Sequence, residues 1–190
     1  MDLLAQHIRN TVSITDKQLD LVISKLDAKT VGKRAHLLQF EQYAKELFFT
    51  LSGCLRSYVT DYNGVEHNIS FSVENWWSGD LPSFINQAPA QVNIQALEET
   101  QVLSINQAHW QLLLREVPPF VSYTRILFRN KMFAQQHRIV QNLSLTAQER
   151  YTLFLAEYPS LSQRISQKHI ASYLGITPEF LSMLRSNKKG

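Results

Sequence analysis

Residues 165–185 read Ile-Ser-Gln-Lys-His-Ile-Ala-Ser-Tyr-Leu-Gly-Ile-Thr-Pro-Glu-Phe-Leu-Ser-Met-Leu-Arg, and the rest of the chain is organised around this stretch. Ile170 and Leu174 place apolar groups on one face of a first short helix. Gly175 can turn the chain with a positive φ, and Ala171 is small enough for a second helix to cross closely. The stretch therefore predicts two short helices around a tight turn.

The second helix is predicted to begin at Pro178. Thr177 is a good N-cap, Pro178 fits the first helical position, and Glu179 favours the positive end of the helix dipole. The residues expected to pack inward are Phe180, Leu181 and Leu184.

The outward face of such a second helix suits the major groove of DNA. The residues expected to face base edges are Glu179, Ser182, Met183 and Arg185. Those expected to approach phosphates are Gln167, Lys168 and Thr177, with Lys188 and Lys189 adding charge. Small helical hairpins that bind no nucleic acid can carry the same pattern, and the two final lysines could be a solvated tail.

The formal charge of +3 is unevenly distributed along the chain. Lys and Arg number 8 against 12 Asp and Glu in residues 1–108, 5 against 1 in residues 109–143, and 6 against 3 in residues 144–190. The sums are −4, +4 and +3. An acidic first part and a basic last part fit a chain whose C-terminal end binds phosphates, although differences this small also arise by chance.

The chain has 190 residues, of which 44% are hydrophobic, so it can bury a core of one domain or two small ones. Its N-terminus does not have a basic start followed by an apolar segment, and we expect a cytoplasmic protein without membrane contact. Cys54 is the only cysteine, which excludes an intramolecular disulfide, and we expect it to be a small core residue.

Residues 2–12 and 15–27 predict two short helices. Between Thr30 and Ile105 the pattern changes to short runs rich in β-branched and aromatic residues. The predicted strands are His36–Phe40, Glu46–Ser52, Leu55–Asp61, Glu66–Ser72, Ala90–Leu97 and Gln101–Ile105. Asn63-Gly64 suits a type I′ hairpin turn, and many short strands at this spacing predict a sandwich or barrel.

Helical periodicity returns at Asn106, which can cap a helix through Arg115. Pro118-Pro119 interrupts this helix, and Phe120–Leu143 contains no glycine or proline, which predicts one long helix. Its apolar residues recur every seven positions and make a surface wide enough to cover the barrel and also meet a second copy. The residues expected in a dimer interface are Phe120, Ile126, Met132, Phe133, Ile139 and Val140. Thr146 and Glu149 predict a capping box that opens a helix through Glu157.

This order of elements resembles the family of the cyclic-AMP receptor protein and the fumarate–nitrate regulator. Phe49-Thr-Leu-Ser-Gly53-Cys-Leu-Arg56 is similar to the family's strand–glycine–strand segment, and Gly79-Asp80-Leu81 is similar to its Gly-Glu-Leu phosphate cassette. The resemblance implies a homodimeric bacterial transcription regulator that binds double-stranded DNA, a small-molecule effector and RNA polymerase. The expected fold class is α+β, with a β-roll (jelly roll) in residues 1–115, a dimerisation helix in 116–143 and a helix-turn-helix domain in 144–190.

The family's nucleotide binders have Arg-Ser or Arg-Thr at the end of the cassette, where Ala90-Gln91 stands in this chain. Without that arginine a cyclic phosphate loses a charge-assisted bidentate contact, so we expect weak cyclic-AMP binding or none. The expected effector pocket is lined by Gly79, Asp80, Leu81, Ala90, Gln91, Gln135 and Gln136. The wing hairpin of the larger family is not expected, because the chain ends at Gly190.

Two other functions compete with DNA binding. A cupin-like enzyme or metal protein needs a cluster of ligands, and the predicted strands contain no His-x-His pair, so neither a metal nor another cofactor is expected and the protein is not expected to be an enzyme. The other alternative is a small-molecule or protein-interaction module whose helix-turn-helix is vestigial. Salt-dependent affinity for DNA would separate these hypotheses.

Overall fold

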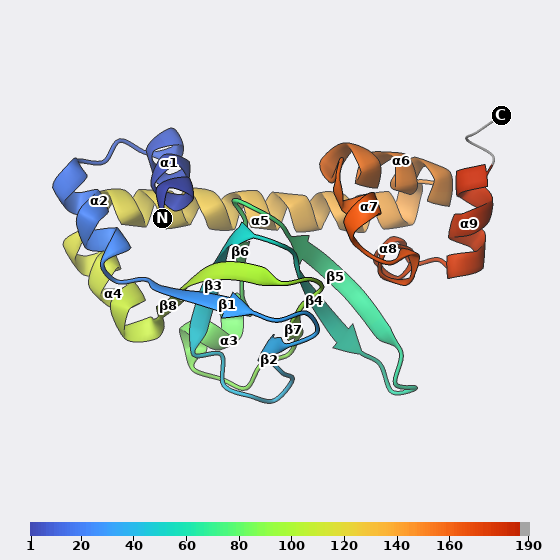
Figure 1. Cartoon of the computed structure of the whole chain (residues 1–190), viewed down its shortest axis with the longest axis horizontal. Coiled ribbons are helices and arrows are strands. Elements are labelled where there is room, and N and C mark those ends of the chain that lie inside the picture. Colours follow the sequence, from blue (N-terminus) through green and yellow to red (C-terminus); the bar gives the residue numbers. More distant parts are fainter. Residues whose placement is uncertain (187–190) are drawn as a thin grey trace. The chain divides into compact units, whose positions relative to one another are not determined.

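The computed structural model describes residues 1–186, which divide into two compact units (Figure 1). Of these described residues, the first unit contains 1–59 and 70–129, and the second contains 60–69 and 130–186. The helices are α1 (Asp2–Thr11), α2 (Asp16–Ile23), α3 (Leu81–Asn86), α4 (Gln107–Glu116), α5 (Pro118–Ser144), α6 (Ala147–Glu157), α7 (Leu161–Arg164), α8 (Gln167–Leu174) and α9 (Pro178–Ser186). The strands are β1 (Asp27–Val31), β2 (His36–Leu38), β3 (Glu46–Ser52), β4 (Leu55–Thr60), β5 (Glu66–Ser72), β6 (Trp77–Ser78), β7 (Asn93–Ala96) and β8 (Thr100–Asn106).

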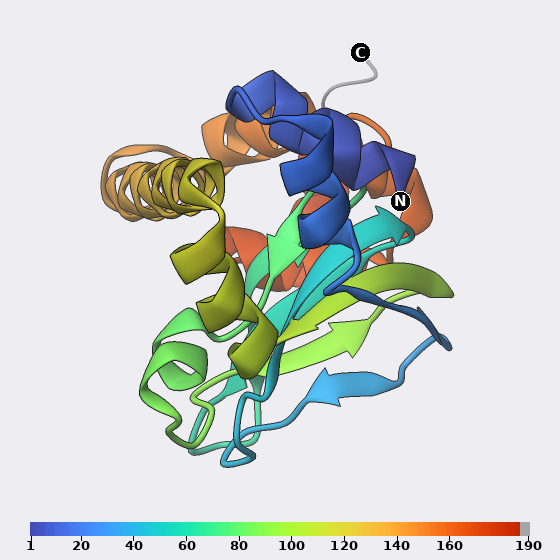
Figure 2. The ribbon, with the colours of Figure 1, turned by 90° about the vertical axis from the view of Figure 1, so that its left-hand side faces the viewer.

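The strands form two four-stranded sheets, in the orders β1-β8-β3-β6 and β2-β7-β4-β5. The strands of the first unit lie below the blue helices α1 and α2 in Figure 2. Strand β3 is buried over Leu47–Thr50 on both of its faces, which explains its continuous apolar run. Its antiparallel pairing with β8 places Phe49 opposite Leu103 at the centre of the core. The predicted roll of short strands is therefore confirmed.

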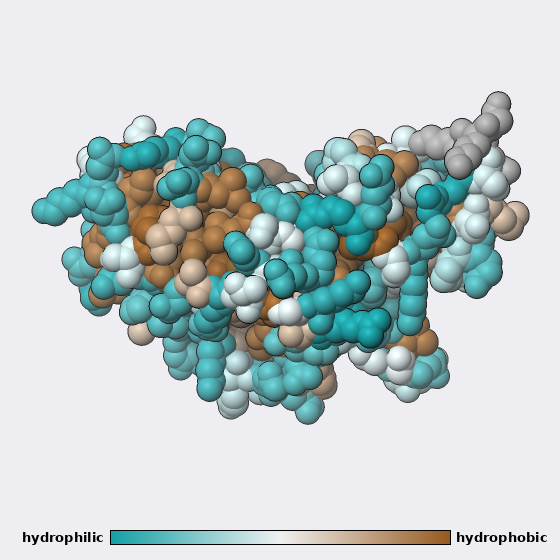
Figure 3. All heavy atoms as spheres, viewed as in Figure 1, coloured by the Kyte–Doolittle hydropathy of each residue, from teal (hydrophilic) through white to brown (hydrophobic). Residues whose placement is uncertain are grey.

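Aromatic residues connect this core to its covering helices. The ring of Trp110 on α4 lies 5.1 Å from that of Phe120 on α5 and 6.1 Å from that of Trp77 on β6. Apolar groups also gather on the face of the first unit around α1 (Figure 3), where partly buried side chains such as Leu3 and Val12 pack against the core. Phe120 is only 1% exposed, so it contributes to the core of its own chain and offers no surface to a partner, contrary to its place among the predicted interface residues.

A partly buried hydrogen-bond chain ties α1 to α5 within the first unit. The indole Nε1 of Trp77 donates to the Tyr123 hydroxyl at 2.8 Å, and that hydroxyl lies 2.8 Å from His7 Nδ1. Because the hydroxyl oxygen already accepts from Trp77, its own proton is available to His7. Burial lowers the pKa of His7 and raises that of Tyr123, so both groups are neutral in this chain.

Two turns show how glycine sets the backbone. The loop between β4 and β5 has a positive φ at Gly64 and not at Asn63, so the predicted type I′ turn is wrong. Gly64 N instead bonds Asp61 O at 3.0 Å and Asp61 N bonds Val65 O at 2.9 Å, as in a three-residue loop with a glycine bulge. Gly53 has a φ of +95°, and a Cβ there would lie 2.5 Å from Thr100 Oγ1, so only glycine fits between β3 and β4.

Several predicted helix limits are confirmed and others are corrected. Asn106 caps α4, since its side chain accepts from His109 N at 2.9 Å, and Thr146 and Glu149 form the predicted capping box of α6. The long helix begins at Pro118, because both prolines fit its first turn, where no intrahelical N–H bond is lost. Strands β1 and β6 and the short helices α3 and α7 were not predicted, because each spans too few residues to show a clear period. The predicted helix over residues 15–27 ends earlier, at Ile23.

In the second unit, the end of β5 packs against α5 and α8. Strand β5 is an edge strand, so its outward N–H and C=O groups need partners outside the sheet. Asn68, only 2% exposed, donates its N–H to Ser172 Oγ at 3.0 Å and its side-chain Nδ2 to His169 O at 2.9 Å. Ser172 Oγ donates in turn to Glu66 O at 2.8 Å. Helix α8 therefore covers the edge of the hairpin.

Arg138 on α5 completes this contact. Its Nη2 donates to the carbonyl oxygens of Asn68 and Tyr173, each at 2.9 Å, and its Nη1 donates to that of Ile69. The guanidinium lies 4.1 Å from the centroid of the Tyr173 ring. Burial lowers the pKa of Arg138, and the three carbonyl dipoles favour its charged form. Strand β5, α5 and α8 are thus joined through one half-buried cation.

Candidate nucleic-acid interface and effector site

Helices α8 and α9 form the hairpin predicted from residues 165–185. Gly175 ends α8 with a φ of +68°, and the N–H of Ile176 bonds Ala171 O at 3.0 Å across the turn. Ala171 and Leu181 are fully buried, which is the close crossing that a small residue permits. The geometry of two helices and a tight turn is therefore as predicted.

The start of α9 follows its sequence closely. Thr177 Oγ1 accepts from Phe180 N at 3.2 Å, Pro178 is the first helical residue and Glu179 lies in the first turn. The candidate base-facing residues Glu179, Ser182, Met183 and Arg185 are all exposed. Phe180 was expected to pack inward and is 41% exposed, whereas Leu181 is fully buried and Leu184 is half-buried.

The candidate phosphate contacts lie on the same hairpin. Gln167 and Lys168 occupy the exposed first turn of α8, and Thr177 lies exposed where α9 begins. Lys188 and Lys189 lie outside the described residues. The structure thus brings the described DNA-binding candidates onto two adjoining helices of one unit, and their role stays a prediction.

The long helix α5 carries unpartnered apolar side chains. Met132, Phe133, Ile139 and Val140 are 57%, 46%, 62% and 54% exposed, and Leu143, which was not named in advance, is 83% exposed. Ile126 is half-buried. A run of such groups on one helix is unusual for a surface that stays in water, so it is a candidate interface.

The predicted phosphate cassette is filled by one of its own side chains. The Asp80 carboxylate, 6% exposed, accepts from Ser83 N at 3.3 Å and from Gln91 N at 2.7 Å. It thereby caps α3 and occupies the backbone N–H groups that could otherwise bind an anion. Ala90 is 1% exposed and supplies no cation. Two negative groups at this place would repel each other, so the geometry disfavours a phosphate ligand.

The other candidates for the effector site are divided between the units. Gly79 and Leu81 are half-buried beside Asp80 in the first unit. Gln135 and Gln136 are exposed on α5 in the second unit, so their part in a common pocket stays a prediction.

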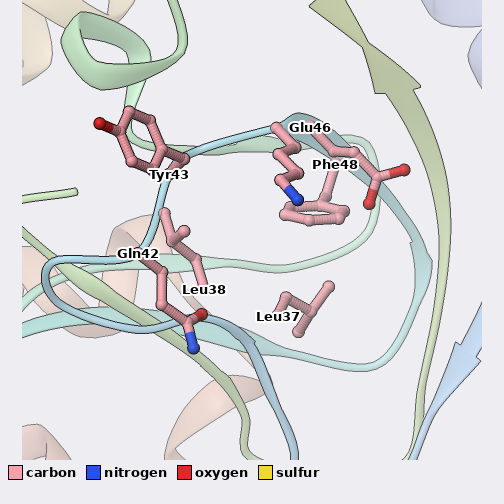
Figure 4. Close-up of a pocket in the computed structure, with 7 residues that line it drawn as sticks. Leu37, Leu38, Gln42, Tyr43, Glu46 and Phe48 are labelled. Atoms are coloured by element: carbon pink, nitrogen blue, oxygen red, sulfur yellow. The ribbon is translucent and has the colours of Figure 1, made fainter. Parts of the chain in front are cut away.

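A pocket of about 450 Å³ opens in the first unit near β2 and β3 (Figure 4). Leu37, Leu38 and Phe48 line it with apolar groups, and Gln42, Tyr43, Lys45 and Glu46 complete its wall. Glu46 is engaged by Lys29 Nζ at 2.6 Å and by Ser104 Oγ at 3.0 Å. None of the predicted effector residues lines this pocket. No sequence pattern predicts this pocket, because it combines residues of β2, of β3 and of the loop between them.

The described residues contain no group of three side chains suited to hold a metal ion. Within the same residues no helix is long and apolar enough to cross a membrane.

The chain is similar to known proteins in sequence and in structure. Residues 28–116 match the family model of the cyclic nucleotide-binding domain. The comparison with curated proteins found no match. FixK2 from Bradyrhizobium japonicum is similar in structure with a TM-score of 0.76 and 16% sequence identity, over 85% of this chain and 83% of that chain. The c-di-GMP-responsive regulator CLP from Xanthomonas campestris is similar with a TM-score of 0.75 and 12% identity, over 92% of each chain.

A protein from Eubacterium rectale, described as a transcriptional regulator of the Crp/Fnr family, is similar with a TM-score of 0.71 and 20% identity, over 90% of this chain and 82% of that chain. At such identities the likeness establishes the fold, which here comprises the β-roll and the long helix. The resemblance that the sequence suggested is thereby confirmed. Residues 28–116 are thus similar to the cyclic nucleotide-binding domain, and the chain has the fold seen in solved regulators of the Crp/Fnr family.

Proposed function

We propose that this chain is a homodimeric, DNA-binding transcription regulator, in which α8 and α9 form a helix-turn-helix that reads a palindromic operator. The observation that carries the proposal is the geometry of α9. Its cap, its buried Leu181 and its exposed outward side chains are those of a helix free to enter a major groove. The fold shared with regulators such as FixK2 supports the same conclusion.

Dimerisation is supported by the exposed apolar stripe on α5, defined by Met132, Phe133, Ile139, Val140 and Leu143. Burial of such side chains in a second copy is worth about 25 cal/mol per Å² of apolar surface removed from water. A two-fold dimer would repeat α9, so operator half-sites should lie about one helical turn of DNA apart.

The proposed effector is a small molecule without a phosphate group, since Asp80 occupies the amides of the cassette. The pocket near β2 and β3, at about 450 Å³, is large enough to hold such a ligand. Its apolar floor favours a ligand with a hydrophobic part.

Selection of binding sites from random DNA tests the main proposal, followed by affinity measurements over a range of salt concentrations. A palindrome should be enriched, and Lys168→Ala should weaken binding to all DNA and reduce the salt slope by up to about one unit per lost phosphate contact. Glu179→Ala should instead relax discrimination at one position of each half-site. If no palindrome is enriched, and if the DNA affinity of neither variant depends on the salt concentration, the alternative of an interaction module is favoured.

A further inference from the structure

The outward face of α9 is divided into a polar side and an apolar side. Successive residues of an α-helix are rotated by about 100°, which places Glu179 and Met183 nearly opposite the buried Leu181. Ser182 flanks them on one side and Phe180 on the other. Phe180 and Met183 are three residues apart and therefore neighbours on the helix surface. They are 41% and 59% exposed, so the apolar side lacks a partner within the described residues.

The surroundings of this apolar side are basic and polar rather than apolar. Among the described residues 144–186, Lys and Arg number 4 against 3 Asp and Glu, and Lys168 and Arg185 are exposed on the two helices of the hairpin. This charge is complementary to phosphates and opposes contact with a basic or purely apolar protein surface. The partner that combines phosphates with an apolar group at helix depth is the DNA major groove, where thymine presents its 5-methyl group.

We propose that Met183, with Phe180 beside it, reads a thymine methyl group in each operator half-site. This inference rests on the proposed DNA binding and names the base that α9 selects. The thioether of methionine has no N–H or O–H to donate and is a weak acceptor, so Met183 distinguishes bases by apolar contact and not by hydrogen bonds. Its flexible, unbranched side chain adapts to the position of the methyl group.

The helical spacing of α9 also predicts how far this thymine lies from the base that Glu179 contacts. The two residues are one helical turn apart, about 6 Å along the axis, which spans one or two base-pair steps of DNA. Glu179 can accept a hydrogen bond from cytosine N4. The half-site should therefore contain a thymine one or two base pairs from the base that responds to substitution of Glu179.

The test uses the full chain and an operator selected by it from random DNA. Each thymine of the half-site is replaced in turn by deoxyuridine, which removes only the methyl group. At one position this should weaken wild-type binding about fourfold per half-site, or about fifteenfold in the symmetric operator. Met183→Ala should bind the thymine and deoxyuridine operators equally. Leu153→Ala, which removes another exposed apolar side chain of the same unit, should keep the wild-type difference.

A converse measurement adds the methyl group. With cytosine at the sensitive position, wild type should bind the 5-methylcytosine form more tightly than the unmethylated form, and Met183→Ala should not distinguish them. Met183→Arg should change the preferred base there to guanine, because arginine bonds guanine O6 and N7.

Three results would overturn the inference. If the chain selects no operator, the proposed function fails with it. If an operator is selected but no thymine-to-deoxyuridine change alters affinity by more than about twofold, the methyl contact is wrong and DNA binding stands. If wild type sediments as a species larger than a dimer and Phe180→Ser with Met183→Ser restores the dimer without changing base preference, the apolar side belongs to a contact between copies.

Discussion

Substitution of Arg138 tests how the β5 edge holds α8. The Arg138 guanidinium donates to three backbone carbonyls, those of Asn68, Ile69 and Tyr173, and lies against the Tyr173 ring. Arg138→Met keeps most of the side-chain volume and removes all of these donors. Arg138→Lys keeps the positive charge, but an ammonium group lacks the planar set of N–H donors with which the guanidinium reaches carbonyls on two elements.

The magnitude follows from the groups left behind. A hydrogen bond to a charged group contributes about 1.5–3 kcal/mol. The three carbonyls that lose this donor can bond to water instead only if the structure around them opens. The buried Nε of Arg138 lacks a partner, and the desolvation of the cation offsets part of the gain. We therefore expect Arg138→Met to destabilise the second unit by about 3 kcal/mol and Arg138→Lys by about 1–2 kcal/mol.

Amide hydrogen exchange measures this loss locally, which matters because a chain of two units need not unfold in one step. Exchange should accelerate in residues 60–69 and 167–174 of the Arg138 variants, while the amides of β3 and β8 keep their protection. Arg125→Met, an exposed arginine of the same helix, is the matched control and should change stability by no more than about 0.5 kcal/mol. Equal exchange in Arg138→Met and Arg125→Met would show that the guanidinium does not hold α8 to β5.

Three further predictions concern the first unit and the dimer. Burial lowers the pKa of His7 below 6.5, so the unfolded chain binds a proton at this residue more readily than the folded chain. The free energy of unfolding measured in urea should therefore fall as the pH drops below about 6.5. His7→Gln should remove this pH dependence, and the same pH profile in wild type and variant would contradict the prediction. Phe133→Glu, which places a charge in the exposed α5 stripe, should give monomers in sedimentation whereas Ala134→Glu, outside the stripe, should not; a monomeric wild type would end this proposal. Cyclic AMP should bind weakly or not at all in calorimetry because Asp80 fills the cassette, and micromolar affinity would refute that.

The fold was predictable where local chemistry and packing favour the same structure. Asn106 and Thr146 are caps in sequence and in space, and the apolar run of β3 coincides with burial on both of its faces. The prediction failed at Asn63-Gly64, where the dipeptide permits a type I′ turn but Asp61 stabilises another loop by accepting from Asn63 N and Val65 N. A short motif limits the possible turns, and contacts with neighbouring residues select one of them.

The candidate site shows the same limit more strongly. The outward residues of α9 were predictable because one buried leucine fixes the rotation of a short helix, although Phe180 was placed on the wrong side. No local pattern pairs Asn68 with Ser172, which lie 104 positions apart in the chain. Their contact depends on β5 being an edge strand, which follows from the strand order and not from any single segment.

Strand β5 carries residues of both units. Strand β5 runs continuously from Glu66–Ile69, which bind α8 and Arg138, into Ser70–Ser72, which belong to the first unit. A strand transmits a shift along its length because its backbone cannot shorten without breaking ladder bonds. We propose that a shift of β5 reaches α8 through the bonds of Asn68 to Ser172 and His169, all within the second unit. Loss of Arg138 should weaken this contact while leaving α5 and its apolar stripe intact, so the contact between β5 and α8 and dimerisation should be separable by mutation.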